Sequence, residues 1–425
     1  MRVHFIGAGG VGVAGLAHIA ADLGWTVTGS DAAPSPMLET LRARGLAVTA
    51  PHGDAVPGEP DAVVYSSAIG ADNAELADAR RRGLRCVRRG EFLGEMAQSF
   101  RTVVAVAGSH GKTSTTAMLA HICREAGLSP GFLVGGLVNG WPRAAAAGDG
   151  SLLVTEVDES DGTQVFTAAS LAVVVNVEDD HCWSHGGVAR LEDCFVQFAR
   201  RAGRVLAWES PTVARLFGGW PTVRLAGPAD APAGLAVPQP GAHNRTDATL
   251  ALLAAEWLGV PEATALAALA TFPGVSRRLS VRQRSADGRR LLVEDYAHHP
   301  TELEATLAAL RESRPGVPLL VVFQPHRHER VRRYGRRFSE LLGAYAERVW
   351  VMAPFAAWTA GGAERAAAAI AGDIPGGRGV YVDGGPEAVA ASVRAELARR
   401  GEDAYTLAVI GAGDVTRVVP LVRLP

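Results

Sequence analysis

Apolar runs alternate with longer segments of helical period along the whole chain. The runs rich in β-branched residues lie at 2–6, 62–66, 102–107, 171–176, 291–295, 318–323, 348–352 and 405–410. Between them, apolar positions that recur every three to four residues predict helices at 112–126, 245–258, 302–312 and 386–399. Strands that are apolar almost throughout and are separated by helices indicate parallel sheets covered on both faces. The pattern therefore predicts an α/β fold.

Interruptions of this pattern predict where the domains begin and end. A length of 425 residues is typical of two to four domains. The segment 98–101 precedes a new strand, and Phe-Pro-Gly-Val-Ser at 272–276 breaks a helical pattern. We place the domains at 1–98, 99–272 and 273–425. The stretch 208–242 is rich in Pro, Gly and Ala, so we expect loops there.

Composition excludes several classes of protein. The net charge of −2 gives no reason to expect nucleic acid or an anionic membrane as a partner. The cysteines, Cys86, Cys123, Cys182 and Cys194, form no C-x-x-C pair, which argues against a disulfide framework or a structural zinc site. No secretory h-region precedes the first strand, and no apolar run is long enough to cross a membrane. We expect a cytoplasmic protein.

The first glycine-rich turn follows the first predicted strand and contains Gly7, Gly9, Gly10 and Gly12, with Asp31 ending the next strand. Glycines let backbone amides and a helix N-terminus approach a phosphate, and the acid can bond ribose hydroxyls. The motif indicates a nucleotide or a nucleotide-sugar diphosphate. An NAD-type cofactor and a purely structural turn are the alternatives.

The second turn is more specific, because it joins a buried strand to a helix and contains a lysine followed by threonine. Its residues are Gly108, Ser109, His110, Gly111, Lys112, Thr113 and Ser114. Amides of such a loop wrap phosphates, the lysine adds positive charge, and the threonine hydroxyl can reach Mg²⁺. Val106 stands where a longer phosphate loop has its first glycine. We expect ATP and Mg²⁺ here.

Two further strands end in acidic or histidine residues. Four acids lie within 156–161, at the end of a predicted strand, and they could hold Mg²⁺ opposite Thr113. His181 ends the segment 176–181 and could be a metal ligand or a general base. Each stretch also has a simpler interpretation, as a solvated acidic loop or a structural histidine.

The C-terminal third carries polar clusters after buried strands at 295–302 and 323–330, together with an Arg pair at 277–278. Arg327 and Arg330 would share a face if helical, which suits bidentate binding of a carboxylate or phosphate. The alternative is a solvated basic face.

Taken together, these motifs resemble the Mur ligase family, the ATP-dependent ligases of peptidoglycan precursor synthesis. The resemblance covers essentially the whole chain, in the family's order. It rests on 107–113 (A-G-S-H-G-K-T), 156–161 (E-V-D-E-S-D), 295–302 (D-Y-A-H-H-P-T-E) and 323–330 (F-Q-P-H-R-H-E-R). The last string is similar to that of the alanine-adding members. Three segments depart from the family pattern: Asp247 replaces an Asn, 179–183 (D-D-H-C-W) loses the second acid of the family's A-D-H-L-D, and 352–362 lacks an acidic end.

The resemblance implies a Rossmann-like first domain for a UDP-sugar, a central P-loop-type ATPase domain, and a Rossmann-like third domain that closes over them and delivers the amino acid. It implies substrates UDP-N-acetylmuramate, L-alanine and ATP, with Mg²⁺, in a monomer or weak homodimer. The site residues it adds are Ser66 and Ser67 for the UDP-sugar; His243, Asn244, Arg278 and Asp295 for ATP; and His298, Arg327 and Arg330 for the amino acid. Lys112, Glu156, His181 and His298 would carry the chemistry, with Thr113, Glu156 and His181 at the metal.

The implied reaction is formation of an acyl phosphate from the sugar carboxylate and ATP, followed by attack of the amino group. Three alternatives stay open. The first is a family member that adds a tripeptide to UDP-N-acetylmuramate, against which the alanine-type string 323–330 argues. An NAD(P)-dependent oxidoreductase would explain 7–12 but not Lys112. The third alternative, a nucleotide-binding regulatory protein, would not explain the histidine and arginine cluster of the third domain.

Overall fold

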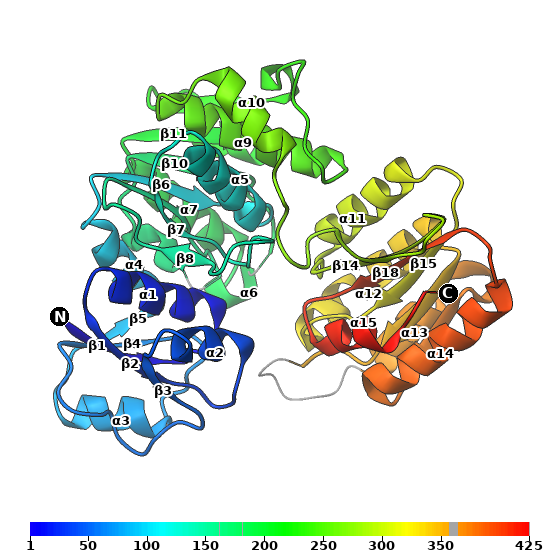
Figure 1. Ribbon diagram of the computed structural model, residues 1–425, viewed down its shortest axis with the longest axis horizontal. Coiled ribbons are helices and arrows are strands. Elements are labelled where there is room, and N and C mark those ends of the chain that lie inside the picture. The colour runs from blue at the N-terminus through cyan, green and yellow to red at the C-terminus, as the bar shows by residue number, and fades with distance from the viewer. Residues whose placement is uncertain (161, 181, 357–363, 425) are drawn as a thin grey trace. The chain divides into compact units, whose positions relative to one another are not determined.

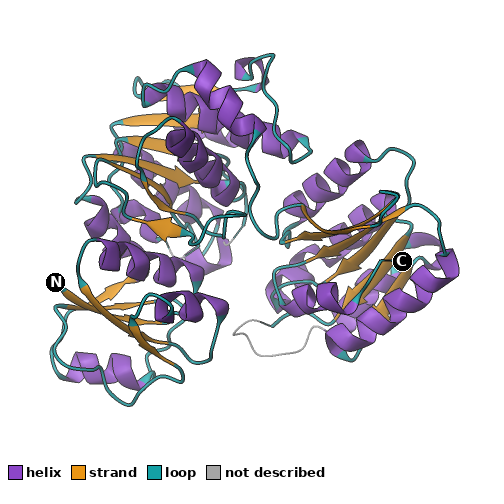
Figure 2. Cartoon of the chain, in the orientation of Figure 1, coloured by secondary structure: helices purple, strands orange, loops and turns teal. Residues whose placement is uncertain are grey.

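A computed structural model describes residues 1–160, 162–180, 182–356 and 364–424. The chain divides into two compact units (Figure 1). The first contains 1–238 and 244–275, and the second contains 239–243 and 276–425. Each unit is built from sheets flanked by helices (Figure 2).

The first unit opens with a five-stranded parallel sheet of order β3-β2-β1-β4-β5. Its strands are β1 (Arg2–Ile6), β2 (Thr26–Ser30), β3 (Ala47–Thr49), β4 (Ala62–Tyr65) and β5 (Cys86–Arg88). Its helices are α1 (Val11–Asp22), α2 (Pro36–Arg42), α3 (Ala74–Arg81) and α4 (Arg89–Ala97). The order reverses at β1, so the carboxyl end of β1 is a switch point where α/β proteins bind ligands.

The second sheet of this unit has seven strands in the order β12-β11-β10-β6-β9-β7-β8, and all pair in parallel except β7 with β8. They are β6 (Thr102–Ala107), β7 (Gly131–Leu133), β8 (Ala145–Ala146), β9 (Leu152–Glu156), β10 (Leu171–Val174), β11 (Arg204–Trp208) and β12 (Val223–Ala226). The helices are α5 (Lys112–Glu125), α6 (Cys182–His185), α7 (Val188–Arg200), α8 (Pro211–Phe217), α9 (Ala242–Trp257) and α10 (Glu262–Ala270), with short turns η1 (Thr163–Phe166) and η2 (Pro228–Asp230). β6 and β9 are neighbours, so the ends that precede Lys112 and follow Thr155 lie together.

The second unit has a six-stranded sheet of order β13-β14-β18-β15-β16-β17, in which only β13 is antiparallel to its neighbour. The strands are β13 (Ser280–Arg284), β14 (Arg290–Asp295), β15 (Leu319–Phe323), β16 (Arg348–Met352), β17 (Gly379–Val382) and β18 (Tyr405–Ile410). The helices are α11 (Pro300–Ser313), α12 (His328–Tyr345), α13 (Glu364–Gly372), α14 (Gly385–Arg400) and α15 (Val418–Leu421), with short turns η3 (Pro375–Gly377) and η4 (Asp414–Arg417).

The predicted α/β class is confirmed, and each predicted strand and helix is present with its ends shifted by at most a few residues. The expectation of loops at 208–242 was wrong for α8 and β12, which lie there, whereas 231–241 contains neither helix nor strand. Pro211, one of the prolines that suggested loops, occupies the first turn of α8 and follows the N-cap Ser210, whose side chain accepts from Val213 N. The boundaries at 98 and 272 stay predictions.

One core cluster joins the two sheets of the first unit. It includes Phe5 and Phe92 beside the first sheet and Leu133, Phe195 and Phe198 beside the second. The segments that carry the two glycine-rich turns therefore belong to one packed body. Among the described residues, no helix is long and apolar enough to cross a membrane.

Asp22, at the end of α1, ties the first sheet to the second. Its carboxylate pairs with Arg44 at 2.6 Å and Arg143 at 2.9 Å and accepts from Ala147 N at 3.0 Å. Burial alone would raise the pKa of Asp22, but the bonds from Arg143 and Ala147 and the charge of Arg44 lower it below its ordinary value. The carboxylate is thus held in its ionised form.

We expect Asp22→Asn to lower the free energy of unfolding by about 1–3 kcal/mol at pH 7, because a charged acceptor held by two arginines and a backbone N–H is lost. A carboxyl whose pKa is lower in the folded chain stabilises the fold above its unfolded pKa of about 4, and this contribution is lost as the pH falls through the folded pKa. The difference between wild type and variant in urea unfolding should therefore shrink below pH 4.

Glu39→Gln is the matched control, because Glu39 also pairs with an arginine, Arg42. The side chain of Glu39 is 60% exposed, whereas that of Asp22 is 18% exposed. That variant should change stability by less than about 1 kcal/mol. An Asp22→Asn effect no larger than this, or one that is independent of pH, would contradict the role given to Asp22.

Candidate active site

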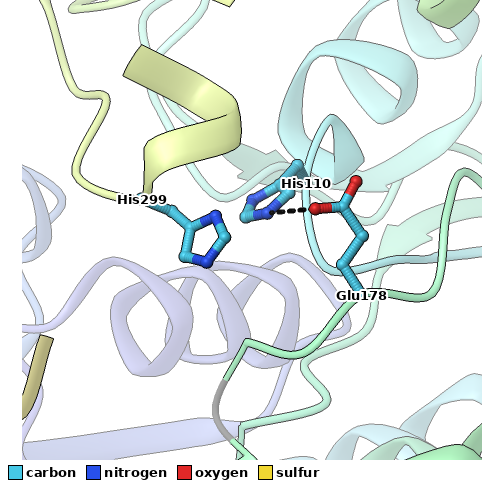
Figure 3. A group of neighbouring side chains, drawn as sticks. All are labelled: His110, Glu178 and His299. Carbon is cyan, nitrogen blue, oxygen red and sulfur yellow. Dashed lines mark ion pairs between the residues drawn. The ribbon is translucent and has the colours of Figure 1, made fainter. Parts of the chain in front are cut away.

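The loop 108–111 is held by hydrogen bonds to the end of β10. Asn176 Oδ1 accepts from His110 N at 2.9 Å, and Asn176 Nδ2 donates to His110 O at 3.1 Å. Ser109 Oγ donates to Glu178 O at 3.1 Å and accepts from Glu178 N at 2.9 Å. His110 Nε2 lies 3.5 Å from Glu178 Oε2, as the dashed line in Figure 3 shows. The loop conformation is therefore set before any phosphate binds, which lowers the entropy cost of binding.

Gly111 is the N-cap of α5 and has a φ of +79°, in the left-handed region. A Cβ placed there would lie 2.5 Å from Asp247 Oδ1 and 2.9 Å from Val175 Cγ1. Both backbone conformation and space therefore require glycine. Asp247, which departs from the family pattern, is buried and packs directly behind the loop.

Lys112 is the only lysine among the 42 Lys and Arg residues of the sequence. It begins α5, and its Nζ donates to the carbonyl oxygens of Gly108 at 2.6 Å and of Ser109 at 3.3 Å. The same Nζ lies 2.7 Å from Glu159 Oε2. The ammonium is thus held by two carbonyl oxygens of the loop and by one carboxylate.

Acidic residues after β9 keep Lys112 charged. Burial alone would lower the pKa of Lys112, but nearby carboxylates outweigh burial and raise that pKa above its ordinary value. In order of effect they are Glu159, Asp158 and Glu156. Burial raises the pKa of Glu159 to about 7, against the opposing effect of Lys112. A cation at this position is therefore retained at neutral pH.

Thr113 and Glu156 meet at the ends of α5 and β9. Thr113 Oγ1 donates to Glu156 Oε2 at 2.9 Å, and Gly135 N donates to the same oxygen at 2.8 Å. A hydroxyl and a carboxylate beside a phosphate loop form a set of hard oxygen donors, the kind that Mg²⁺ prefers. His181, the third predicted metal ligand, lies outside the described residues.

The first glycine-rich turn is hydrogen-bonded to the end of β2. Gly7 N and Ala8 N donate to Ser30 O at 2.8 and 2.9 Å, and Gly9 N donates to Asp31 Oδ2 at 2.7 Å. Gly10 is the N-cap of α1 and provides no side-chain cap. Asp31 thus fixes the conformation of the turn. It also lies at the strand end where an acid would bind a ribose.

The remaining predicted residues of the first unit lie at different depths. The Cβ of Ser66 is 3.0 Å from the position of a Cβ on Gly7, so Ser66 lines the turn, whereas Ser67 is exposed. Ser114 is the residue after Thr113 in the first turn of α5. Asn244 is buried near the start of α9.

In the second unit, Asp295 ends β14 and is buried. Its carboxylate accepts from Leu279 N at 2.7 Å, Ala297 N at 2.8 Å and Thr306 Oγ1 at 3.1 Å. Burial raises the pKa of Asp295. These bonds hold the loops on both sides of the strand, and contact with ATP stays a prediction.

Arg278 and His243 belong to the same unit. Arg278 Nη1 lies 3.5 Å from Glu302 Oε1, and its guanidinium is stacked 5.3 Å from the ring of Tyr296. Burial, followed by the charge of Arg278, lowers the pKa of His243 to about 4, so the imidazole is neutral at pH 7. A neutral ring can accept a hydrogen bond, as a nucleotide contact would require.

The predicted amino-acid residues gather around His326, at the end of β15. The rings of His298 and His326 are 5.3 Å apart, and Arg330 Nη1 lies 3.4 Å from His326 Nδ1. Arg330 is fully buried at 0% exposed. Phe355 stacks on His326, with ring centroids 5.8 Å apart and planes at 10°.

Arg327 is not helical, so it does not share a helix face with Arg330. It is the N-cap of α12, with φ 62° and ψ 134°. Its N donates to Phe355 O at 2.9 Å, which joins the strand end to the segment after β16. Positive φ in a non-glycine residue is uncommon and is concentrated at functional sites.

Sequence motifs did not single out four residues that shape these sites. Asn176 holds the phosphate loop, Glu159 holds Lys112, and Arg89 pairs with Asp158 at 2.8 Å. Asn176, Asp158 and Glu159 belong to motifs already noted, but the individual roles depend on which strands are neighbours. Arg89 lay in no motif and had no such signal.

Comparison with known proteins was made on the whole chain. Residues 2–101 match "Mur ligase family, catalytic domain", and residues 277–413 match "Mur ligase, glutamate ligase domain". A UDP-N-acetylmuramate–L-alanine ligase of Coxiella burnetii is 34% identical over 385 residues, covering 83% of this chain and 82% of that protein. One from Acidovorax sp. is 37% identical over 385 residues, covering 80% and 79%.

Among solved structures, the chain is similar to the UDP-N-acetylmuramate-alanine ligase MurC of Thermotoga maritima. The TM-score is 0.82 at 25% identity, over 99% of this chain and 97% of that one. A murein peptide ligase from Psychrobacter arcticus has a TM-score of 0.71 at 22% identity, over 99% and 98%, which shows the shared fold.

We expect Gly111→Ala to destabilise the protein by about 1–3 kcal/mol and to abolish ATP binding, because strain and the clash with Asp247 displace the loop. Gly127→Ala, at the other end of α5, is the matched control. Gly127 also has a positive φ, +78°, but a Cβ there meets nothing within 4 Å. Urea unfolding and ATP titration should show a smaller stability loss and normal ATP affinity for the control; equal defects would contradict the steric explanation.

Proposed function

This chain belongs to the Mur ligase family of ATP-dependent, amide-bond-forming enzymes, and from that premise we propose that it joins L-alanine to the carboxylate of UDP-N-acetylmuramate. The products are the amide, ADP and phosphate. The observation that carries the proposal is the placement of Lys112 and of the Thr113–Glu156 pair on a preformed phosphate loop. The relatives at 34% and 37% identity support the choice of substrates.

A carboxylate is a poor electrophile, so it must be activated before an amine can attack it. The sugar carboxylate attacks the γ-phosphorus of ATP, the bond to the β-phosphate oxygen breaks, and an acyl phosphate and ADP form. The amine then attacks the acyl carbon, and phosphate leaves. Lys112 and the loop amides offset the charge that builds on the phosphoryl oxygens in the first step.

Thr113 and Glu156 would hold a Mg²⁺ ion, and the oxygen donors found there fit it. Such an ion, when bound, neutralises charge shared between the β- and γ-phosphates. Glu156 is kept in place by Gly135 N independently of the hydroxyl, so the carboxylate is oriented in advance. His181 stays a predicted ligand.

Arg330, His298 and His326 form the proposed amino-acid site in the second unit. The guanidinium of Arg330 is fully buried, and the carboxylate of an amino acid is a planar group that matches its fork. Arg327, whose strained backbone is fixed by Phe355 O, would supply a second cation. Arg278, His243 and Asn244 are proposed to contact ATP.

A tripeptide-adding ligase is the second candidate, since the murein peptide ligase of P. arcticus has the same fold. The curated relatives with 34–37% identity are alanine-adding enzymes, which favours the smaller acceptor. Family membership leaves no support for the oxidoreductase and regulatory alternatives.

Lys112→Ala should abolish phosphate release while UDP-N-acetylmuramate still binds, because the two ligands use different turns. Lys112→Arg keeps the charge but replaces the compact ammonium with a larger fork, so it should also lose at least about 100-fold in kcat. Arg124→Ala removes a cation from the far end of the same helix and should behave as wild type. Turnover of ATP by Lys112→Ala at the wild-type rate would contradict the role of Lys112.

The acceptor is tested by phosphate release with UDP-N-acetylmuramate and, separately, L-alanine, glycine, L-serine or a tripeptide. We expect L-alanine to give the highest kcat/KM, with the amide product confirmed by mass spectrometry. A higher kcat/KM with the tripeptide would favour the second candidate. Phosphate release that needs no amino acid would overturn the ligase proposal.

A further inference from the structure

Arg277 precedes β13, and its side chain contacts the chain just after β18, at residues 411–413 (the glycine loop, Gly-Ala-Gly). Its Nη2 donates to the carbonyl oxygens of Gly411 at 2.7 Å and of Gly413 at 3.4 Å. β18 lies between β14 and β15 in the sheet of the second unit and runs parallel to both (Figure 1). The carboxyl ends of these strands lie at one edge of the sheet. One guanidinium thus holds both ends of the glycine loop, at the edge where the proposed amino-acid site lies.

The guanidinium of Arg277 is itself held by residues at the end of β14. Its Nε lies 3.0 Å from Glu294 Oε1, and the side chain of Glu294 is 2% exposed. Neither atom makes a hydrogen bond of good geometry, so this contact is an ion pair. The guanidinium also lies 4.9 Å from the ring centroid of Tyr296, and Arg277 O accepts from Tyr296 N at 2.7 Å. The φ of Arg277 is +62°, a strained value that persists only where the surroundings hold it.

The glycine loop packs against residues that surround His326. A Cβ on Gly413 would overlap the side chains of Gln324 and Phe355, so the backbone at this position is in direct contact with both. Gln324 Oε1 accepts from Val415 N at 2.9 Å, which ties the chain after the loop to the end of β15. Glycine at position 413 is therefore required for the close approach of the loop to these two side chains.

Phe355 connects the glycine loop to the proposed amino-acid site. Its ring stacks on the ring of His326, with centroids 5.8 Å apart and planes at 10°. Phe355 N donates to Pro325 O at 2.9 Å, and Phe355 O accepts from Arg327 N at 2.9 Å. Phe355 thus contacts the chain on both sides of His326. A displacement of the glycine loop would therefore move the imidazole and the start of α12 together.

We infer that Arg277 is a positioning residue for the amino-acid site and that it acts through the glycine loop and Phe355. This inference rests on the proposed function and adds to it a residue that need not touch the amino acid. A role in stability alone is the alternative. The Arg277 side chain is 25% exposed, so water can replace it at the two carbonyl oxygens. The fold should then survive the loss of Arg277, whereas the position of the loop should not.

Steady-state kinetics of phosphate release test this inference. Arg277→Met keeps the length of the side chain but removes its charge and its donors. We expect the KM for L-alanine to rise about 10- to 100-fold, since a misplacement of about 1 Å can cost a factor of about 100. The KM values for ATP and UDP-N-acetylmuramate should stay within about threefold of wild type.

Two outcomes with Arg277→Met would overturn the inference. An equal rise in the KM for ATP would assign the effect to the neighbouring Arg278, which is proposed to contact ATP. An unchanged KM for L-alanine, with or without a lower midpoint of unfolding in urea, would leave Arg277 a structural role only.

Arg282→Met is the matched control, because Arg282 Nε lies 3.5 Å from the other oxygen of the same carboxylate, Glu294 Oε2. The Arg282 side chain is 45% exposed and, within the described chain, makes no hydrogen bond to the glycine loop. This variant should have the wild-type KM for L-alanine. A rise equal to that of Arg277→Met would mean that loss of any cation beside Glu294 is sufficient, which contradicts a route through the loop.

A double variant tests whether Arg277 acts through Phe355. Phe355→Ala removes the ring that stacks on His326 and should raise the KM for L-alanine by itself. Residues that act through one another are not additive. Phe355→Ala combined with Arg277→Met should therefore have about the same KM as Phe355→Ala alone, and losses that multiply would refute this route.

Arg277→Lys keeps a cation beside Glu294 but replaces the fork with a single ammonium. It should fold and still raise the KM for L-alanine by at least about threefold, so it tests the inference even if Arg277→Met does not fold. A wild-type KM in this variant would overturn the inference and leave the proposed function intact. Phosphate release by the wild-type protein that needs no amino acid would instead overturn the proposed function.

Discussion

The ammonium of Lys112 and its acidic neighbours form the interaction on which the first unit depends. A cation removed from water is costly unless charges and hydrogen bonds replace the lost hydration. Here two loop carbonyls and Glu159 replace it. The chain uses arginine everywhere else, so the single lysine marks a place where a compact charge on a flexible stem is needed. In the proposed function, a phosphate of ATP would take the place of Glu159 as the anionic partner of Lys112, so the charge there would stay balanced.

The arrangement of strands brings these charges together. β6 leads into the phosphate loop, β9 leads into the acids, and β10 leads into Asn176, and the three strands are neighbours. Their carboxyl ends lie at one edge because all three run parallel. The second unit has the same arrangement, since Asp295 is the last residue of β14 and His326 lies just after β15. Each sheet therefore collects at one edge polar groups that are far apart in the sequence.

Much of this could be predicted from the sequence, and the exceptions have physical causes. Strands such as β6 and β15 are buried on both faces, and their continuous apolar residues identify them. Edge strand β12 is partly exposed and short, and α8 begins with proline, so the same stretch was predicted as loops. Gly111 and Lys112 were recognisable from local spacing alone. Arg89 was not, because its position depends on the packing of α4 against α1 and on the loop after β9.

Acidic residues that look alike in the sequence have different roles, and their partners in the structure distinguish these roles. Asp295 follows a buried strand as Glu156 does, yet its oxygens accept from two backbone amides and a threonine hydroxyl. These three donors are neutral and hold the loops on both sides of the strand, although the charge of Arg278 also acts on the carboxylate. Asp158 and Glu159 instead face cations, each of which comes from a segment beside a glycine-rich turn. An acid that faces such a cation fixes where the positive charge lies and keeps it beside the turn.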